Sequence, residues 1–230
     1  MPVTASAIIV AAGSGSRLAC SVPKAFVPLG GQPLLFYSMQ SLAEVPEVAE
    51  VVVTLPEGES YRTEARQIAR RARLTTPLKL VRGGTRRQDS VALGLGLTSA
   101  ESDIVVVHDA ARPFATPSLF KLCIAAAAKL SAAIVAISVA DTLKVVSGGV
   151  ITATRSRDGL YQAQTPQAFS RSLLIQAHAR ANSDPIPATD DADLIQRIGA
   201  RVAIVEGNSR NLKITTRADL ELAELIARSS

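Results

Sequence analysis

The chain alternates short apolar runs with amphipathic segments of helical period. The runs are rich in β-branched residues and bounded by turn residues, as expected of strands buried on both faces. They occupy residues 7–12, 51–55, 78–81, 104–108 and 133–138. Helical patterns lie between them, at about 33–44, 60–73, 88–98 and 116–130. This alternation predicts right-handed βαβ crossovers and an α/β fold with a doubly wound, mostly parallel sheet.

The pattern changes after residue 138. Two strand-like segments, 142–146 and 150–154, flank a Ser-Gly-Gly turn, which predicts a β-hairpin. Helices at about 170–181 and 190–198, a strand at 201–206 and a helix at 216–228 complete the pattern. No repeat or linker-like composition divides the chain. We therefore expect a single domain over 1–230, with a protruding β-arm at 139–156 that reaches a second subunit.

Composition narrows the class of protein. The chain is 47% hydrophobic and 20% charged, which is typical of a globular domain and excludes a disordered chain. No apolar run approaches the roughly 20 residues of a membrane span, and the apolar start leads into a glycine-rich turn instead of a signal-peptide cleavage site. The two cysteines, Cys20 and Cys123, cannot build a disulfide framework or a metal knuckle. These features predict a cytoplasmic protein without a membrane partner.

The charge balance favours anionic partners. The formal net charge is +5, which suits phosphates but does not say which. Five arginines crowd the segment 62–73, where glutamates lie close by and Tyr61 is the one aromatic residue. A nucleic-acid surface would interleave more aromatic residues with the arginines. We interpret this segment as a solvated helix face and expect no nucleic-acid partner.

The first predicted strand ends in a glycine-rich turn, Ala11-Ala12-Gly13-Ser14-Gly15-Ser16-Arg17. In open α/β folds nucleotides bind at this carboxyl edge, where glycines let backbone N–H groups approach phosphate oxygens. The dinucleotide fingerprint fits poorly, because Leu18 stands where its third glycine belongs. The ATPase phosphate loop is excluded because the chain contains no Gly-Lys pair.

A turn followed by basic side chains fits better. Arg17 comes directly after the glycines, and Lys24 follows seven residues later. Because Val22 precedes a proline and is held extended, we expect Lys24 on a fixed, non-helical segment beside the glycines. Two such cations can stabilise the charge that develops when a nucleoside triphosphate is attacked at its α-phosphorus. A tight turn with two surface cations is the alternative.

The fourth predicted strand also ends in polar residues. Asp109 and Arg112 follow it and are expected at the same sheet edge as the glycines. Asp109 can bind a hydroxyl or a Mg²⁺-linked water, and Arg112 can bind phosphate; alternatively the two side chains pair and organise the loop. For His108 we favour a structural role at the strand end over general-base catalysis. For Cys20 we favour a passive small residue over a nucleophile, since no histidine lies in a local pairing motif.

Motif-like blocks follow one another in order from residue 11 to residue 223: AAGSGSR with PKAF, GGTRRQDSV, VVHDAARP, DTLK, RDGLYQAQTPQAF, TDDADLIQRIG and NLKITTRADLELA. The first block alone is typical of the broad sugar-nucleotide transferase class. The whole series resembles the 2-C-methyl-D-erythritol 4-phosphate cytidylyltransferase family of the non-mevalonate isoprenoid pathway. The resemblance implies a Rossmann-like nucleotidyltransferase fold and a reaction between CTP and this polyol phosphate, with Mg²⁺ bound mainly through the CTP phosphates.

The resemblance also implies roles for particular residues. Arg17 and Lys24 match transition-state stabilisers, and Arg157 and Lys213 match residues that position the methylerythritol phosphate. Thr142 and Arg157 match positions that enter the neighbouring subunit's site, which implies a homodimer through the β-arm. Further substrate-site positions are matched by Asp109, Arg112 and Thr165, and the segments lining the nucleotide by Ala11, Ala12, Gly13, Gly83, Thr85, Arg87 and Ser90. The ligands of the metal are left unknown.

Two departures from the family pattern and three alternatives stay open. Ser16 stands where a second basic residue is frequent, and for Thr189 in the TDD block we favour a helix N-cap over a metal ligand.

Ribitol 5-phosphate cytidylyltransferase shares the same motifs and is the nearest alternative function. A non-catalytic nucleotide-binding regulator would be expected to lack Lys24 or Lys213. A nucleic-acid-binding module would show DNA binding that falls steeply with salt.

Overall fold

The computed structural model describes residues 3–15, 18, 20, 22–181 and 188–229. In the first half of the chain the elements are β1 (Ala5–Val10), the 3₁₀ turn η2 (Lys24–Phe26), β2 (Pro28–Leu29), β3 (Gln32–Pro33), α1 (Leu34–Ala43), β4 (Val48–Leu55), α2 (Glu59–Arg71), β5 (Leu78–Arg82), α3 (Arg87–Leu95) and β6 (Ile104–Asp109). In the second half they are α4 (Pro117–Leu130), β7 (Ala132–Ser138), β8 (Leu143–Ser147), β9 (Val150–Arg155), β10 (Tyr161–Ser170), α5 (Arg171–Ala181), α6 (Asp191–Arg197), β11 (Ala203–Glu206) and α7 (Arg217–Arg228).

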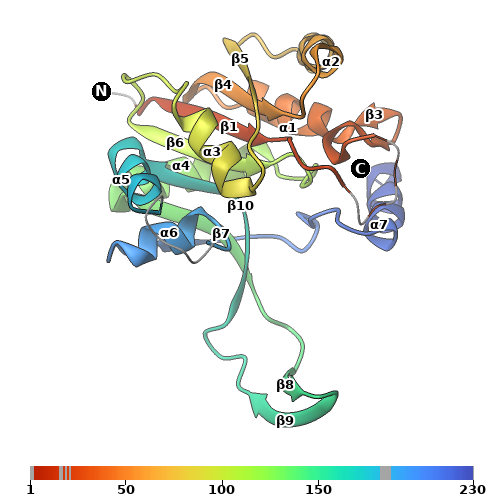
Figure 1. Ribbon diagram of the computed structural model, residues 1–230, viewed down its shortest axis with the longest axis vertical. Helices are drawn as coiled ribbons and strands as arrows, with labels where there is room; N and C mark the ends of the chain where they lie inside the picture. Colours follow the sequence, from red (N-terminus) through yellow and green to blue (C-terminus); the bar gives the residue numbers. More distant parts are fainter. Residues whose placement is uncertain (1–2, 16–17, 19, 21, 182–187, 230) are drawn as a thin grey trace.

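A seven-stranded sheet in the order β11-β7-β10-β6-β1-β4-β5 forms the centre of the molecule (Figure 1). β1 pairs in parallel with both β4 and β6, and the pairs β4–β5 and β7–β11 are parallel as well. β10 runs antiparallel to both of its neighbours, β6 and β7. The predicted doubly wound, mostly parallel sheet is therefore confirmed.

Helices cover the sheet on both faces because successive strand residues point to opposite sides. On one face Ile9 and Val53 are fully buried in a cluster with residues of α1, α2 and α4. On the other face Ile8 and Val52 are equally buried among residues of α3, α5 and α6. Strands covered on both faces carry continuous apolar runs, which is the pattern that the sequence showed.

The helix start predicted at the Thr-Pro dipeptide is confirmed in α4. The hydroxyl of Thr116 accepts a hydrogen bond from the Leu119 amide at 3.4 Å, and Pro117 is the first helical residue. Proline is well suited to this position, because its missing N–H would have no helical partner there. The helix ends at Ser131, whose φ of 69° lies in the left-handed region.

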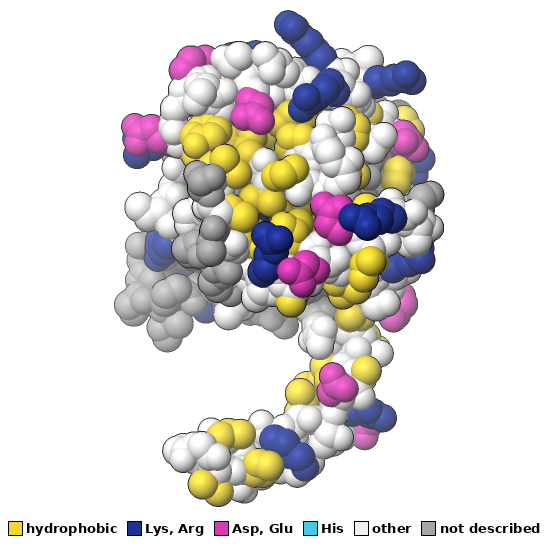
Figure 2. All heavy atoms as spheres, turned by 90° about the vertical axis from the view of Figure 1, so that its right-hand side faces the viewer, with side chains coloured by type: hydrophobic (Ala, Val, Ile, Leu, Met, Phe, Trp, Pro, Cys, Tyr) yellow, Lys and Arg dark blue, Asp and Glu magenta, His cyan; other side chains and the backbone are white. Residues whose placement is uncertain are grey.

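The β-arm leaves the body between β7 and β10. Its two legs run outward from the sheet, and the β8–β9 hairpin lies at the far end, well away from the body (Figure 1). Every described residue of β9 is exposed. The hydrophobic side chains at the tip include Val146, Val150 and Ile151, and Figure 2 shows the arm as a hook below the body. The predicted hairpin at 142–154 is therefore present.

Two strand features differ from the expectation. The sequence pattern did not predict β10, because its residues YQAQTPQAFS alternate polar and small side chains and include Pro166, and proline is rare within central strands. Pairing with β6 and β7 supplies the order that the local sequence lacks, with a register shift between Ala163 and Gln167. The short β2–β3 hairpin was also not predicted, since each strand has two residues.

No helix within the described ranges combines the length and apolar character needed to cross a membrane.

At Gly94, α3 packs tightly against side chains of β1 and β4. A Cβ at this position would lie 2.8 Å from Ile8 Cγ2 and 3.2 Å from Thr54 Cγ2. We predict that Gly94→Ala lowers the free energy of unfolding by about 1 to 3 kcal/mol, because the helix must move off the sheet. Urea unfolding measures this.

Gly96→Ala is the matched control on the same helix end. Gly96 has ordinary helical angles, and its Cβ would meet its nearest neighbour, the Leu93 carbonyl oxygen, at 3.6 Å. The substitution should be neutral or stabilising by up to about 1 kcal/mol. Equal losses in the two variants would show that close helix–sheet contact is not the reason for glycine at position 94.

Candidate functional site

The glycine turn after β1 holds Lys24 at the edge of the sheet. The Lys24 amide donates to the Gly13 carbonyl at 3.2 Å, and Ala11 N donates to the Thr54 carbonyl at 2.9 Å. Gly15 has a φ of +71°, and a Cβ there would lie 3.1 Å from Lys24 Cβ. Lys24 therefore lies beside the glycines, as expected. The expectation of a non-helical segment at Lys24 is wrong. Pro23 is extended, but Lys24 begins the 3₁₀ turn η2.

Arg17 and Ser16 lie outside the described residues. The prediction that Arg17 stabilises the transition state stays a prediction, as does the effect of a serine at position 16.

A second glycine turn, after β5, approaches the first one closely. The Gly83 amide donates to the Leu55 carbonyl at 2.8 Å, and a Cβ at Gly83 would lie only 2.2 Å from Ala12 Cβ. The Ser90 hydroxyl accepts a hydrogen bond from Gly84 N at 3.1 Å. Glycine at position 83 is thus required by the contact between the two turns. Between these turns and β6 lies a cavity of about 420 Å³.

Most residues predicted to line the nucleotide do line this cavity. They are Ala11, Ala12, Gly13, Thr85, Arg87 and Ser90, together with Lys24, Asp109 and Lys213. Gly83 itself is not in the lining, and its neighbour Gly84 takes that place. Figure 2 looks onto this edge of the sheet, where basic and acidic side chains lie next to one another among hydrophobic ones.

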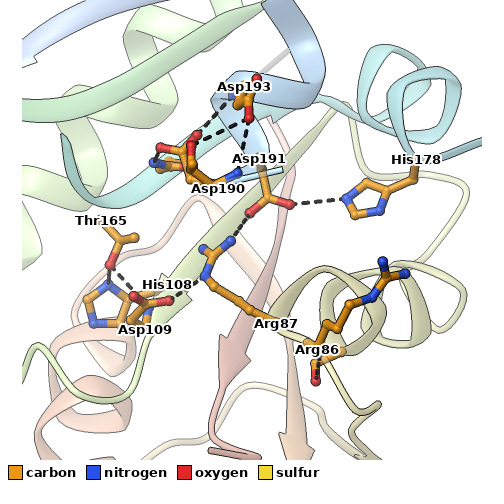
Figure 3. Close-up of polar contacts among 12 residues, drawn as sticks. Arg86, Arg87, His108, Asp109, Thr165, His178, Asp190, Asp191 and Asp193 are labelled. Carbon is orange, nitrogen blue, oxygen red and sulfur yellow. Dashed lines mark hydrogen bonds and ion pairs between the residues drawn. The ribbon is translucent and has the colours of Figure 1, made fainter. Parts of the chain in front are cut away.

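Asp109, at the end of β6, is held between two cations. Arg87 Nε donates to Asp109 Oδ1 at 2.9 Å, and Lys213 Nζ donates to Asp109 Oδ2 at 2.6 Å (Figure 3 shows the first contact). Burial by itself would raise the pKa of Asp109, but the charges of Arg87 and Lys213 outweigh it and lower the pKa well below its usual range. Asp109 is therefore a permanent anion at neutral pH.

Behind Arg87 lies a second buried acid. Arg87 Nη1 donates to Asp191 Oδ2 at 2.7 Å, and His178 Nε2 lies 3.1 Å from Asp191 Oδ1 (Figure 3). Burial would lower the pKa of Arg87, but the two carboxylates raise it above its usual value. The guanidinium thus divides its donors between two acids on different elements and links α3, β6 and α6.

A smaller cavity of about 220 Å³ adjoins the first. Arg112 and Thr165 line it, and Arg87, Asp109 and Lys213 line both cavities. These three charged residues therefore form the wall between the two spaces. The structure thereby brings together predicted residues from the first, second, third, fifth and last sequence blocks, at the carboxyl edge of the sheet.

The suggested pairing of Asp109 with Arg112 is wrong. The two oxygens of Asp109 are occupied by Arg87 and Lys213, and the Arg112 guanidinium donates instead to the Asn211 carbonyl at 2.7 Å and the Ala163 carbonyl at 3.1 Å. Burial is the main cause that lowers the pKa of Arg112. Its role in the structure is to tie the loop after β6 to β10 and to the segment before α7.

Two further expectations concern the helix α6 and Cys20. Asp190, not Thr189, is the N-cap: its Oδ1 accepts from the Asp193 amide at 2.9 Å, because Thr189 lies one residue too early. Cys20 packs against a small apolar cluster that includes residues of α7, and Cys20 Sγ lies 3.4 Å from the Leu18 carbonyl oxygen. This packing agrees with a passive residue.

The arm residues are not brought to the two cavities. Thr142 lies just before β8, and Arg157 Nη1 donates to the Ala140 carbonyl at the base of the arm. Arg157 lines a separate cavity there with Tyr161 and neighbouring residues. Within this chain, therefore, Arg157 and Lys213, the predicted phosphate-positioning pair, lie at different cavities.

Several polar residues of the site were not predicted. Asp191 and His178 form the layer behind Arg87, and Asn211 donates from Nδ2 to the Thr165 carbonyl at 2.9 Å. Asp191 lies within the TDDADLIQRIG block, and Asn211 opens the NLKITT block, so the motif blocks could have identified both as candidate site residues. His178 sits on an amphipathic helix with no motif around it.

Two adjoining cavities at the carboxyl edge of a doubly wound sheet, separated by a wall of charged side chains, suit the joining of a nucleotide to a second substrate. The fold and the site thus define an α/β nucleotidyltransferase. The chain belongs to the 2-C-methyl-D-erythritol 4-phosphate cytidylyltransferase family, whose profile matches residues 5–229.

Individual relatives agree with this assignment. The chain is 44% identical over 218 residues to the 2-C-methyl-D-erythritol 4-phosphate cytidylyltransferase of Syntrophotalea carbinolica, covering 94% of this chain and 93% of that protein. The crystal structure of the enzyme of that name from Thermus thermophilus is similar with a TM-score of 0.81, at 35% identity, over 99% of this chain and 100% of the other. A 4-diphosphocytidyl-2C-methyl-D-erythritol synthase from Anaerococcus prevotii superimposes with a TM-score of 0.85, at 29% identity and the same coverage.

We predict that Asp191→Ala lowers the free energy of unfolding by about 3 to 5 kcal/mol, because it removes one partner of a buried ion pair and leaves the Arg87 charge partly uncompensated. Denaturant unfolding at neutral pH measures the loss. Glu221→Ala is the control, since Glu221 pairs with Arg217 at 3.2 Å on the exposed face of α7. That change should cost less than about 1 kcal/mol. Similar losses in both variants would contradict a special role for the buried pair.

Proposed function

We propose that this protein transfers a cytidylyl group from CTP to 2-C-methyl-D-erythritol 4-phosphate, giving 4-diphosphocytidyl-2-C-methyl-D-erythritol and pyrophosphate. Family membership supports the reaction, and one observation on this chain carries the proposal. The charged wall of Arg87, Asp109 and Lys213 faces a larger and a smaller cavity at once. The larger cavity suits the nucleotide and the smaller one the polyol phosphate, so their phosphates can meet at the wall.

The chemistry needs positioning and charge stabilisation more than proton transfer. A phosphate oxygen of the acceptor attacks the α-phosphorus of CTP, and the bond to the β-phosphate oxygen breaks to release pyrophosphate. The attacking phosphate is already an anion at neutral pH, so no strong general base is required. In our proposal Lys24 and Arg17 stabilise the charge on the α-phosphate, and Lys213 holds the acceptor phosphate in line.

We propose that the glycine turns read the base of CTP. Ala11, Ala12 and Gly13 line the larger cavity together with Thr85 and Ser90. Small residues leave room for main-chain donors and acceptors to reach the edge of a pyrimidine. Arg87 and Asp109, joined by an ion pair, lie in the wall that this space shares with the smaller cavity.

Mg²⁺ enters the proposal with the nucleotide. Within the described residues no three His, Cys, Asp or Glu side chains cluster as metal ligands. Asp109, the acid at the centre, has both oxygens occupied by cations. These residues therefore do not fit a metal site built by the protein alone. We expect Mg²⁺ to be bound mainly through the CTP phosphates, and no step of the proposed reaction passes through it.

We further propose a homodimer built through the β-arm. Its tip exposes Val146, Val150 and Ile151, whose side chains need a covering surface. Arg157 and Thr142 lie on the arm, away from both cavities of their own subunit. In the dimer they complete the acceptor cavity of the partner subunit. The free thiols Cys20 and Cys123 suit a reducing compartment, so we place the dimer in the cytoplasm.

Product analysis tests the proposed function. The enzyme is incubated with CTP and Mg²⁺ and either 2-C-methyl-D-erythritol 4-phosphate or ribitol 5-phosphate, and products are identified by mass spectrometry and pyrophosphate release. We expect the first acceptor and CTP to be strongly preferred over ribitol 5-phosphate, UTP and ATP. Preference for ribitol 5-phosphate would support the alternative cytidylyltransferase. Absence of any transfer with bound CTP would support the non-catalytic regulator.

Lys24→Ala should lower kcat by about 10²- to 10³-fold, since it removes a preorganised donor to the charge on the α-phosphate. The fold should persist, because Lys24 lies at the edge of a surface cavity. Lys129→Ala, on the exposed side of α4, is the matched control and should retain wild-type kcat. Near-normal turnover in Lys24→Ala would remove this residue from the mechanism.

Subunit mixing tests the shared site. Lys24→Ala and Arg157→Ala, each inactive alone, should recover up to about a quarter of wild-type activity after subunit exchange, because half of the dimers then hold one intact site. The control mixes Lys24→Ala with Lys213→Ala, two residues of the same subunit's site, and should recover nothing. If Arg157 serves its own subunit, the first mixture stays inactive despite proven exchange.

A further inference from the structure

His108 is a buried titratable residue that the proposed reaction does not use. It is the penultimate residue of β6, directly before Asp109, and is 0% exposed. Its imidazole ring packs against Phe120 with ring centroids 4.9 Å apart and an interplanar angle of 62°. Its Nδ1 lies 3.0 Å from the hydroxyl of Thr165, a residue that lines the smaller cavity (Figure 3).

The Thr165 hydroxyl has a limited set of hydrogen bonds. It accepts from the Asp109 amide at 3.1 Å, which uses one of its two lone pairs. Its single proton and its second lone pair remain. If His108 Nδ1 is bare, the hydroxyl donates its proton to the ring and keeps a lone pair for a ligand. If Nδ1 carries the ring proton, the hydroxyl accepts from the ring and its own proton is left for the ligand.

The two states of His108 thus give the acceptor cavity opposite properties at Thr165. In the first, Thr165 Oγ1 can accept a hydrogen bond from an alcohol O–H. In the second, it can only donate, for example to a phosphate oxygen. The tautomer of His108 therefore sets whether the Thr165 hydroxyl accepts a hydrogen bond from a ligand or donates one to it.

We propose that His108 is a positioning residue, which holds the Thr165 hydroxyl proton at Nδ1 and so makes Thr165 an acceptor for a hydroxyl group of the polyol phosphate. This inference rests on the proposed function and adds the recognition of an alcohol group to it. The phosphate of the same substrate is then bound by Lys213, which lines the same cavity.

The surroundings of the ring agree with this assignment. Burial lowers the pKa of His108 to about 4, although the charge of Asp109 partly opposes it, so the ring is neutral at neutral pH. No acceptor among the described residues reaches Nε2 with full hydrogen-bond geometry. Among the described residues, Nδ1 is the one acceptor that the Thr165 hydroxyl contacts. A proton on Nε2 leaves that nitrogen alone without a partner, whereas a proton on Nδ1 would leave the Thr165 hydroxyl proton without one as well, which favours the proton on Nε2.

Two substitutions of His108 separate the hydrogen bond from the packing. His108→Phe keeps the ring volume and removes the acceptor, and we expect the KM for the polyol phosphate to rise about tenfold while the KM for CTP stays within about twofold. His108→Asn places Oδ1 near the position of Nδ1 and should restore the acceptor KM to within about threefold of wild type. Phe120→Leu loosens the same packing and should lower thermal stability without changing the acceptor KM.

Combining substitutions of His108 and Thr165 tests whether the histidine acts through the threonine. In a Thr165→Val background His108→Phe should add no further rise in the acceptor KM, because the histidine acts through the threonine. An acceptor KM unchanged in His108→Phe, or an equal further rise in the Thr165→Val background, would overturn the proposal.

Nitrogen-15 NMR of the histidine rings tests the same hydrogen bond without using the reaction. The chain has two histidines, so a His178→Gln variant assigns both sets of signals. We expect His108 to show a bare, hydrogen-bond-accepting Nδ1 and a protonated Nε2 at neutral pH. A protonated Nδ1 refutes the proposal whatever the kinetics. If no polyol phosphate is cytidylylated, the proposed function fails, and the NMR result still decides the tautomer.

Discussion

The buried carboxylate of Asp109 depends on two cations that come from distant parts of the chain. Arg87 belongs to α3 and takes one oxygen, and Lys213 precedes α7 and takes the other. Removing either cation would leave the buried charge of Asp109 only partly compensated, which is more costly than losing a surface pair. The positions of α3, β6 and the segment before α7 are therefore coupled. Asp191 extends this coupling to α6, because it holds the other side of the Arg87 guanidinium.

Local sequence predicted those parts of the fold whose stability is local or periodic. The strands β1, β4, β6 and β7 carry continuous β-branched runs because both faces of the sheet are covered, and such runs are readable without partners. β10 is different. Its glutamines and Pro166 argue against a central strand, and its order comes from pairing with β6 and β7, which no local pattern encodes.

The candidate site was predicted at the level of the sheet edge but not at the level of individual contacts. The ends of parallel strands meet at one edge, so Gly13 and Asp109 could be placed together from the sequence, and Gly83 was added by the family resemblance. The residue that forms the ion pair with Asp109 could not be predicted in this way. Arg112 is close to it in sequence, yet Arg87, 22 residues earlier, makes the ion pair. Sequence separation within a loop does not say which way a guanidinium points, and the carboxylate of Asp191 adds a second attraction from α6.

The placement of β10 has a consequence for the arm. The two legs of the arm continue two neighbouring strands of the central sheet, β7 and β10, whose antiparallel register pairs Tyr161 with Ser138 at the exit from the body. The hydrogen bonds between β7 and β10 in the core therefore set the direction of the arm. A one-residue slip of this ladder would exchange buried and exposed side chains and would also change the direction in which the arm leaves the body. The strand pairing that keeps Ala168 and Phe169 in the core therefore also fixes the direction of the β8–β9 hairpin, which lies far outside the core.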